Sequence, residues 1–306
     1  MSTTSNDLFL RSDIDRSQEL RQFFHGVRGG RHLLRLEALA MRLNALDELD
    51  AIIGGLDLGA LMTCSDPELF ECAQALRSRL EAANEMLYEA ARAEIALQGN
   101  SPAMEGWLME LANDGDAERP RPGLSFDVLD EVVSGVLRLR RPDEAGLRQS
   151  AEMTAYQPTP ARHILDLIAA CKFSEVDVLV DLGSGLGHVP LLVSILTGIC
   201  TLGVEVQPDH TASAQEAAQS LGLRRVRFVA EDARMTDLSR GTVFYMFSPF
   251  TGSILKDVLC RLHAQSKERR IRVCSLGPCT RILQSQTWLR ASRRPDAERI
   301  AVFRTL

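Results

Sequence analysis

The feature that most constrains the fold is a glycine-rich segment directly after a short apolar run. The run Val178–Asp181 is apolar and β-branched, and Gly183, Gly185 and Gly187 follow it at alternate positions. Alternate glycines let a backbone turn sharply and approach a ligand without a Cβ in the way. An apolar, helix-like segment begins at His188, and a helix N-terminus offers unpaired amides to such a ligand. The pattern therefore predicts a strand, a ligand-binding loop and a helix in succession.

Strand-like and helix-like segments alternate from Thr154 to the end of the chain. Such alternation specifies a parallel sheet that helices cover on both faces. The last two strand-like segments are separated only by residues 292–299, which are too few for a crossover helix, so we expect an antiparallel hairpin there. We predict helices at 161–171, 188–197, 209–221 and 253–265, and strands at 176–181, 200–206, 226–230, 242–247, 270–276, 287–291 and 300–305.

The N-terminal part of the chain has the periodicity of helices instead. Asp66 is a typical N-cap for a helix that Gly99 would end. The segment that follows, at 113–124, is rich in Gly, Pro and charged residues and shows no periodicity of a helix or a strand. We therefore expect a helical domain at 1–112, a linker at 113–124 and an α/β domain at 125–306. An amphipathic stripe supports the helices, with Leu36, Leu39, Leu43, Leu46 and Leu49 at three- and four-residue steps.

Charge and cysteine content narrow the classes of partner and site. Residues 1–150 carry 16 basic and 26 acidic side chains, whereas 151–306 carry 19 and 15. The first half would repel a nucleic acid and the second would tolerate an anionic partner, unless both are simply solvated surfaces. Seven scattered cysteines without a CxxC pair argue against a disulfide framework and a zinc site, and we expect no metal. No long apolar run or secretory signal is evident, so we expect no membrane span and a cytoplasmic location.

An acidic residue follows at the end of the second predicted strand of the α/β domain. Glu205 lies twenty residues after Gly185 and closes the apolar run before it. One carboxylate there can accept hydrogen bonds from both hydroxyls of a ribose. The dinucleotide fingerprint fails, however, because His188 occupies the position of its third glycine.

The form Asp181-x-Gly-x-Gly-x-Gly, followed by Glu205, resembles the class I S-adenosylmethionine-dependent methyltransferases. That resemblance implies a Rossmann-like, seven-stranded sheet ending in an antiparallel hairpin, with S-adenosylmethionine as the cofactor. It places Asp181 and the glycine loop at the methionine end, Glu205 at the ribose, and Asp232 with Ala233 at the adenine, where Glu231 competes. The cofactor-binding residues expected in full are Asp181, Gly183, Ser184, Gly185, Gly187, Glu205, Val206, Asp232, Ala233 and Thr159.

A narrower resemblance rests on Tyr156, Thr159, an amphipathic helix and then Val-Asp-Leu-Gly-Ser-Gly-x-Gly. Over about 154–258 the sequence looks like the catalytic core of the disruptor-of-telomeric-silencing type of histone-lysine methyltransferase and its bacterial relatives. In that family a short loop here folds over the methionine moiety of the cofactor. Gln157 and Pro158 replace the Gly-Glu of the family loop, so the resemblance does not extend to a histone substrate. Thr159 is also a sensible N-cap for the helix at 161–171.

The segment Ser248-Pro249-Phe250 follows the fourth predicted strand of the sheet. Ligands bind at the carboxyl edge of open α/β sheets, and in class I enzymes this loop frames the methyl acceptor. We therefore expect these three residues to bind substrate, with Ser248 and Tyr156 as the candidate catalytic residues. The loop partly resembles the Asn-Pro-Pro-Tyr/Phe motif of amino methyltransferases, but Ser248 replaces the amide and one proline is absent.

The resemblances imply methyl transfer to a small molecule or a protein side chain, with nucleic acid a weaker alternative. A non-catalytic scaffold or sensor that binds S-adenosylmethionine is a second hypothesis, favoured by the altered loop at Ser248. A nicotinamide-dependent oxidoreductase is a third. The helical N-terminal domain is expected to form a lid, a recruiting module or the interface of a homodimer.

Overall fold

The computed structural model describes residues 16–27, 31–53, 66–114, 125–142 and 151–306. These residues form two compact units, Met1–Ala90 and Ala91–Leu306, which we describe separately. Of the predicted linker, Asn113 and Asp114 belong to the last turn of a helix, and the other residues lie outside the described part of the chain. The predicted domain boundary therefore stays a prediction.

The first unit is helical, as the leucine spacing indicates. Asp66 accepts a hydrogen bond from the amide of Leu69, which confirms it as a helix start. Arg42 is fully buried in this unit, and its guanidinium donates to the side chain of Asn84 and to the carbonyls of Leu33 and Arg35. Residues 16–26 are helical, and the further elements are η1 (Arg31–Leu34), η2 (Leu36–Ala38), α2 (Leu39–Ile53) and α3 (Pro67–Gln98), the last of which continues into the second unit.

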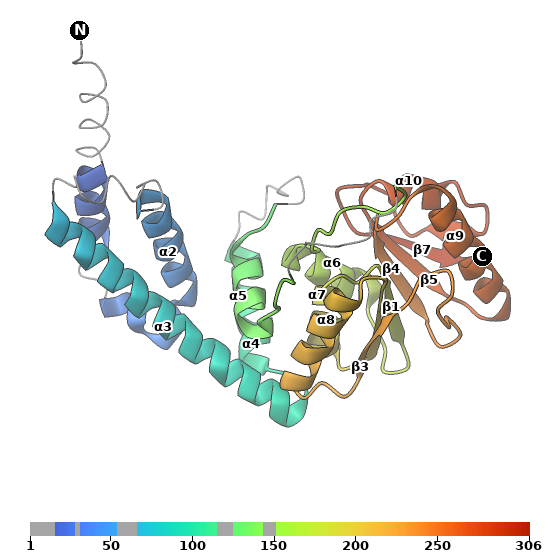
Figure 1. Cartoon of the computed structure of the whole chain (residues 1–306), viewed down its shortest axis with the longest axis horizontal. Helices are drawn as coiled ribbons and strands as arrows, with labels where there is room; N and C mark the ends of the chain where they lie inside the picture. Colours follow the sequence, from blue (N-terminus) through green and yellow to red (C-terminus); the bar gives the residue numbers. More distant parts are fainter. Residues whose placement is uncertain (1–15, 28–30, 54–65, 115–124, 143–150) are drawn as a thin grey trace, which may run out of the picture. The chain divides into compact units, whose positions relative to one another are not determined.

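The second unit contains one seven-stranded sheet in the order β3-β2-β1-β4-β5-β7-β6 (Figure 1). The first five strands are parallel, and β7 is antiparallel to both β5 and β6. This order is that of the class I methyltransferase fold, and it confirms the predicted terminal hairpin. The strands are β1 (Val178–Leu182), β2 (Cys200–Glu205), β3 (Val226–Ala230), β4 (Val243–Phe247), β5 (Arg272–Leu276), β6 (Leu289–Ala291) and β7 (Ala301–Thr305).

Helices cover both faces of the sheet. In Figure 1, α6, α7 and α8 lie on one side and α9 lies on the other. The helices of this unit are α4 (Pro102–Asp114), α5 (Val128–Leu137), α6 (Ala161–Cys171), α7 (His188–Thr197), α8 (Pro208–Ser220), α9 (Gly252–Glu268) and α10 (Cys279–Gln284). The short helix α10 is the one element after 154 that the sequence did not predict.

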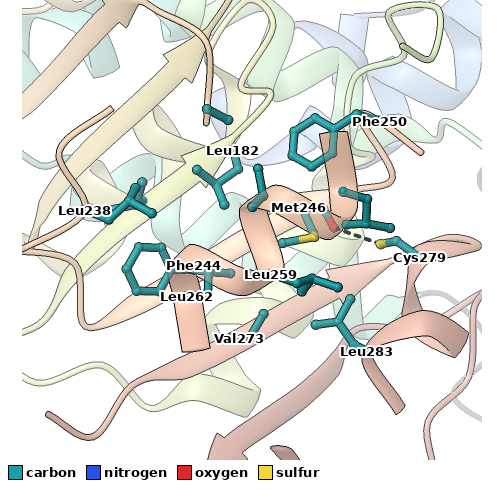
Figure 2. Packing of buried hydrophobic residues seen from close by; sticks show 14 of the residues in the cluster. Leu182, Leu238, Phe244, Met246, Phe250, Leu259, Leu262, Val273, Cys279 and Leu283 are labelled. Carbon is teal, nitrogen blue, oxygen red and sulfur yellow. Dashed lines mark hydrogen bonds between the residues drawn. The ribbon is translucent and has the colours of Figure 1, made fainter. Parts of the chain in front are cut away.

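The core on the α9 face shows how the strand residues alternate. Leu182, Phe244, Met246 and Val273 point to this face, and Leu259 of α9 packs against them (Figure 2). Fully apolar strands that alternate between two covered faces are typical of a parallel sheet. This core fixes the positions of the carboxyl ends of β1 and β4, where the polar residues lie.

The start of α6 differs from the prediction. Pro160, rather than Thr159, is the N-cap residue, and it has no side-chain acceptor to cap the helix. The amide of Ala161 instead donates to the carboxylate of Asp130 in α5, at 2.7 Å. The hydroxyl of Thr159 is thereby left for another partner, the hydroxyl of Tyr245, at 3.1 Å.

Candidate active site

A cavity of about 370 Å³ opens at the carboxyl ends of β1 to β4. The segment 153–159 forms another part of its wall. The predicted site residues that line it are Tyr156, Thr159, Asp181, Gly183, Ser184, Glu205, Val206, Asp232, Ala233, Ser248, Pro249 and Phe250. Gly185 and Gly187 are the two predicted residues that do not line it.

The glycines of the loop make close approaches that no side chain would permit. Gly183 has φ +86°, and a Cβ there would lie 2.3 Å from the Cβ of Pro249. Gly185 has φ +51°, and its Cβ would lie 2.2 Å from the ring of Tyr156. The loop therefore contacts two elements of the cavity wall directly, the β4 loop and the segment at Tyr156, and Gly187 packs inward against Phe228.

Glu205, at the end of β2, is held by two backbone amides. Its Oε2 accepts from the amide of Gly185 at 2.9 Å, and its Oε1 accepts from the amide of Gln207 at 2.9 Å. The side chain is almost completely buried, at 9% exposure. A carboxylate offers about four lone-pair sites, so each oxygen keeps capacity for one more donor. Glu205 is thus fixed in orientation with its remaining lone pairs at the cavity.

Asp181, at the end of β1, is buried without such partners. Its exposed fraction is 4%, and no hydrogen bond from the described residues shifts the pKa of its carboxyl. Burial, and then the charge of Glu205, raises the pKa of this carboxyl well above its ordinary value. Ser184 also lines the cavity, and its buried Oγ has no hydrogen-bond partner among the described residues. Both groups are suited to a ligand that donates hydrogen bonds, and a cation would also stabilise the charged form of Asp181.

The predicted adenine end is formed by the residues after β3. Asp232 lines the cavity, but both of its carboxylate oxygens accept hydrogen bonds from the guanidinium of Arg234. These bonds lower the pKa of Asp232. Glu231, the competing acid, and Ala233 line the cavity as well. Asp232 therefore stays ionised, with its orientation set by Arg234.

Ser248 uses its hydroxyl within the fold. The Oγ donates to the carbonyl of Leu276 at 3.1 Å and accepts from the amide of Cys279 at 3.0 Å. Ser248 has φ +42°, which is uncommon for a residue other than glycine. These contacts make Ser248 a positioning residue that joins the β4 loop to α10, and a separate catalytic role for it stays a prediction.

A strap formed by residues 152–154 fixes the other side of the β4 loop. The carboxylate of Glu152 accepts from the amides of Ser253 and Ile254 at the start of α9. The amide of Thr154 donates to the carbonyl of Pro249, and its hydroxyl donates to the carbonyl of Ser248. Tyr156, whose ring lies against Gly185 of the glycine loop, follows the strap two residues later.

Two histidines lie beside Tyr156. The hydroxyl of Tyr156 is 3.4 Å from Nδ1 of His188, and its ring centroid is 5.0 Å from that of His210. Burial, and then the charge of Arg141, lowers the pKa of His188 to about 4, so this imidazole is neutral at physiological pH. Burial raises the pKa of Tyr156, so the phenol keeps its proton.

His210 and Cys279 line the cavity although the sequence did not indicate them. His210 follows Glu205 by five residues, in the first turn of α8, so the position after the acid-bearing strand was a usable signal. Cys279 begins α10, a helix of six residues that is too short to leave a periodic pattern.

The charged side chains that line the cavity are mainly acidic. Four carboxyl groups line it, those of Asp181, Glu205, Glu231 and Asp232, and the described lining residues include no lysine or arginine. Such a wall attracts a cationic ligand and repels an anionic one.

The described residues contain neither a candidate metal site nor a candidate membrane span. Within the ranges given above, no group of three or more His, Cys, Asp or Glu side chains is placed to hold a metal ion. In those same ranges, no helix combines the length and the apolar character that crossing a bilayer requires.

Comparison with known proteins gives one family match by sequence. Residues 142–244 match the family described as Histone methylation protein DOT1. No curated protein matches the chain.

Several solved structures are similar at low TM-score. An RNA methyltransferase from Salinibacter ruber in complex with S-adenosyl-L-homocysteine is 25% identical, with a TM-score of 0.39 over 49% of this chain and 92% of that one. A SAM-dependent methyltransferase from Aquifex aeolicus is 17% identical, with a TM-score of 0.38 over 46% and 88%. MtNAS in complex with MTA and tNA is 14% identical, with a TM-score of 0.39 over 94% and 97%.

The matched segment contains β1 to β3 with the glycine loop, and it reaches into β4. The chain therefore carries a class I S-adenosylmethionine-dependent methyltransferase domain whose core resembles the histone methylation protein DOT1 family.

Proposed function

We propose that the chain binds S-adenosylmethionine in the 370 Å³ cavity and transfers its methyl group to a small molecule or a protein side chain. The observation that carries this proposal is the buried pair of acids at the ends of β1 and β2, in a wall without described cations. S-adenosylmethionine brings a sulfonium, an ammonium group and two ribose hydroxyls, which suit such a wall. A nicotinamide dinucleotide would place its anionic diphosphate against the same carboxylates, so the wall disfavours it.

Three parts of this cofactor, the ammonium group, the ribose and the adenine, would have partners in the wall. Asp181 would pair with the ammonium group, and Ser184, which also lines the cavity, would lie at the methionine end. Glu205 would accept from the ribose hydroxyls. Asp232, or Glu231, would accept from the adenine amino group, next to Ala233.

The cofactor supplies the chemistry, which is in-line displacement of a methyl group from sulfur by a nucleophile. The chain supplies position: the β4 loop, held by Ser248 and by the strap, would frame the acceptor opposite Tyr156. Tyr156 keeps its single O–H proton. Neutral His188 can accept a hydrogen bond from this O–H and so set the direction of the phenol, whose oxygen can then accept a hydrogen bond from the acceptor.

The acceptor is tested by incubating the full chain with tritiated S-adenosylmethionine and fractionated lysate. Labelling of a metabolite or of a protein, with release of S-adenosylhomocysteine, would support the proposal and select between the two acceptor classes. Tight binding of the cofactor with no turnover in any fraction would instead favour the scaffold or sensor, which the occupied hydroxyl of Ser248 already supports. The homodimer through the helical N-terminal domain and the cytoplasmic location stay predictions.

A further inference from the structure

A second cavity, of about 320 Å³, lies beside the first. The two cavities share four lining residues, Tyr156, Pro158, Thr159 and His188. The rest of the second cavity comes from α5 and the residues that flank it, the start of α6, Leu186 of the glycine loop and Arg141, with apolar side chains such as those of Val133 and Leu186. A ligand group that passes the shared residues therefore leaves the acidic cavity and enters a different electrostatic environment.

The charges of S-adenosylmethionine make this difference important. Its methionine end carries an ammonium group and a carboxylate on the same carbon, so both must be placed close together. Asp181 suits the ammonium group, but the carboxylate would face the acids of the first cavity without a described cation in its wall. A carboxylate so placed needs a positive partner close by.

Arg141 is the one arginine that the described wall of the second cavity contains, and that wall has no lysine. Its guanidinium carbon lies 5.9 Å from the ring centroid of Tyr156. No ion pair joins Arg141 to any described carboxylate, whereas its neighbour Arg140 lies 3.8 Å from Glu216. Its charge nevertheless acts on the shared wall, since it lowers the pKa of His188.

Asp130, the acid in the second cavity, forms no ion pair with Arg141 among the described residues. One carboxylate oxygen of Asp130 accepts from the amide of Ala161, and the other accepts from the amide of Asp127. These bonds hold the side chain in the capping box of α5. The guanidinium is thus available to an anionic group that reaches the shared residues.

We propose that Arg141 binds the carboxylate of the methionine end of S-adenosylmethionine, across the wall formed by Tyr156, Thr159 and His188. This proposal rests on the proposed function, because it takes the cofactor to lie in the first cavity. Arg141 precedes the strap in the sequence, so the cofactor would have a binding residue that belongs neither to the glycine loop nor to the strand ends. The ammonium group and the carboxylate of the methionine end would thereby have separate partners of opposite charge, Asp181 and Arg141.

The test compares two ligands that differ only in this carboxylate, S-adenosylmethionine and decarboxylated S-adenosylmethionine. Calorimetry on the full chain and on Arg141→Ala should show that the substitution weakens binding of S-adenosylmethionine about 10-fold, equivalent to about 1.4 kcal/mol. Binding of the decarboxylated ligand should change less than about 2-fold, since an exposed arginine contributes little without its partner. Arg140→Ala is the matched control and should leave both affinities unchanged, because Arg140 pairs with Glu216.

Unchanged affinity of Arg141→Ala for S-adenosylmethionine would overturn the proposal, and so would an equal loss for both ligands. Arg141→Lys keeps the charge and should lose less affinity than Arg141→Ala. If Arg141→Ala does not fold, the unmodified chain still decides: a preference for the ligand with the carboxylate supports the proposal, and equal affinities contradict it. An unmodified chain that binds neither ligand would refute the proposed function itself.

Discussion

Replacement of Glu205 by alanine separates the binding role of this carboxylate from its role in the fold. The side chain accepts from the amides of Gly185 and Gln207, both at 2.9 Å, and its remaining lone pairs face the cavity. Loss of two ribose hydrogen bonds to a charged acceptor costs about 1.5–3 kcal/mol, which weakens S-adenosylmethionine binding about 10- to 100-fold. The two amides also lose their acceptor, so we expect a lower melting temperature.

Calorimetry with S-adenosylmethionine and its 2′-deoxy analogue distinguishes these two effects. The unmodified chain should bind the 2′-deoxy analogue more weakly, and Glu205→Ala should bind both ligands alike, because the partner of the missing hydroxyl is gone. Glu205→Gln should bind S-adenosylmethionine nearly as weakly as Glu205→Ala does, since the NH2 group of the glutamine must face either a backbone N–H or the ribose. Glu216→Ala, on the surface of α8, is the control. The reasoning is refuted if Glu205→Ala keeps full affinity, or if deleting the 2′-hydroxyl costs the same with and without Glu205.

Three further substitutions test other parts of the account. Asp181→Asn should abolish cofactor binding by calorimetry yet raise the melting temperature of the cofactor-free protein. Burial raises the pKa of this carboxyl in the folded state, so its destabilising effect develops as the pH rises above the unfolded value of about 3.8 and is complete above the raised pKa; the gain should therefore vanish below a pH of about 3.8. Gly185→Ala should displace Tyr156 and weaken binding at least about 10-fold, as a 2.2 Å contact and φ of +51° require, whereas Gly198→Ala, with no neighbour within 4 Å, should leave affinity unchanged. Ser248→Ala should lower stability by about 1–3 kcal/mol in urea unfolding because the amide of Cys279 loses its acceptor, and a turnover rate that falls with no loss of stability would make Ser248 catalytic instead.

The sheet and the helices after residue 154, except α10, were predictable because their signals are local. Each strand is a short apolar run, and the short segment 292–299 alone dictates a hairpin. The glycine loop and Glu205 were predictable as a unit for the same reason, since about twenty residues separate them and a single helix lies between.

The contacts that complete the cavity join residues far apart in the chain, and no local pattern encodes them. Glu152 caps α9 about a hundred residues later, and Ser248 depends on the amide of Cys279 in a helix that left no periodic signal. Thr159 has the residue type of an N-cap, but its hydroxyl meets Tyr245 across the fold while Asp130 satisfies the helix amide. In each case tertiary packing, rather than propensity, decides the partner.

A crystal structure of the full chain with S-adenosylhomocysteine tests the central claim most directly. We predict its ribose hydroxyls within hydrogen-bond distance of Glu205, its ammonium group beside Asp181 and its carboxylate on the side of Arg141. A complex in which the product lies elsewhere, or in which other side chains close the space between β1 and β2, would contradict the account.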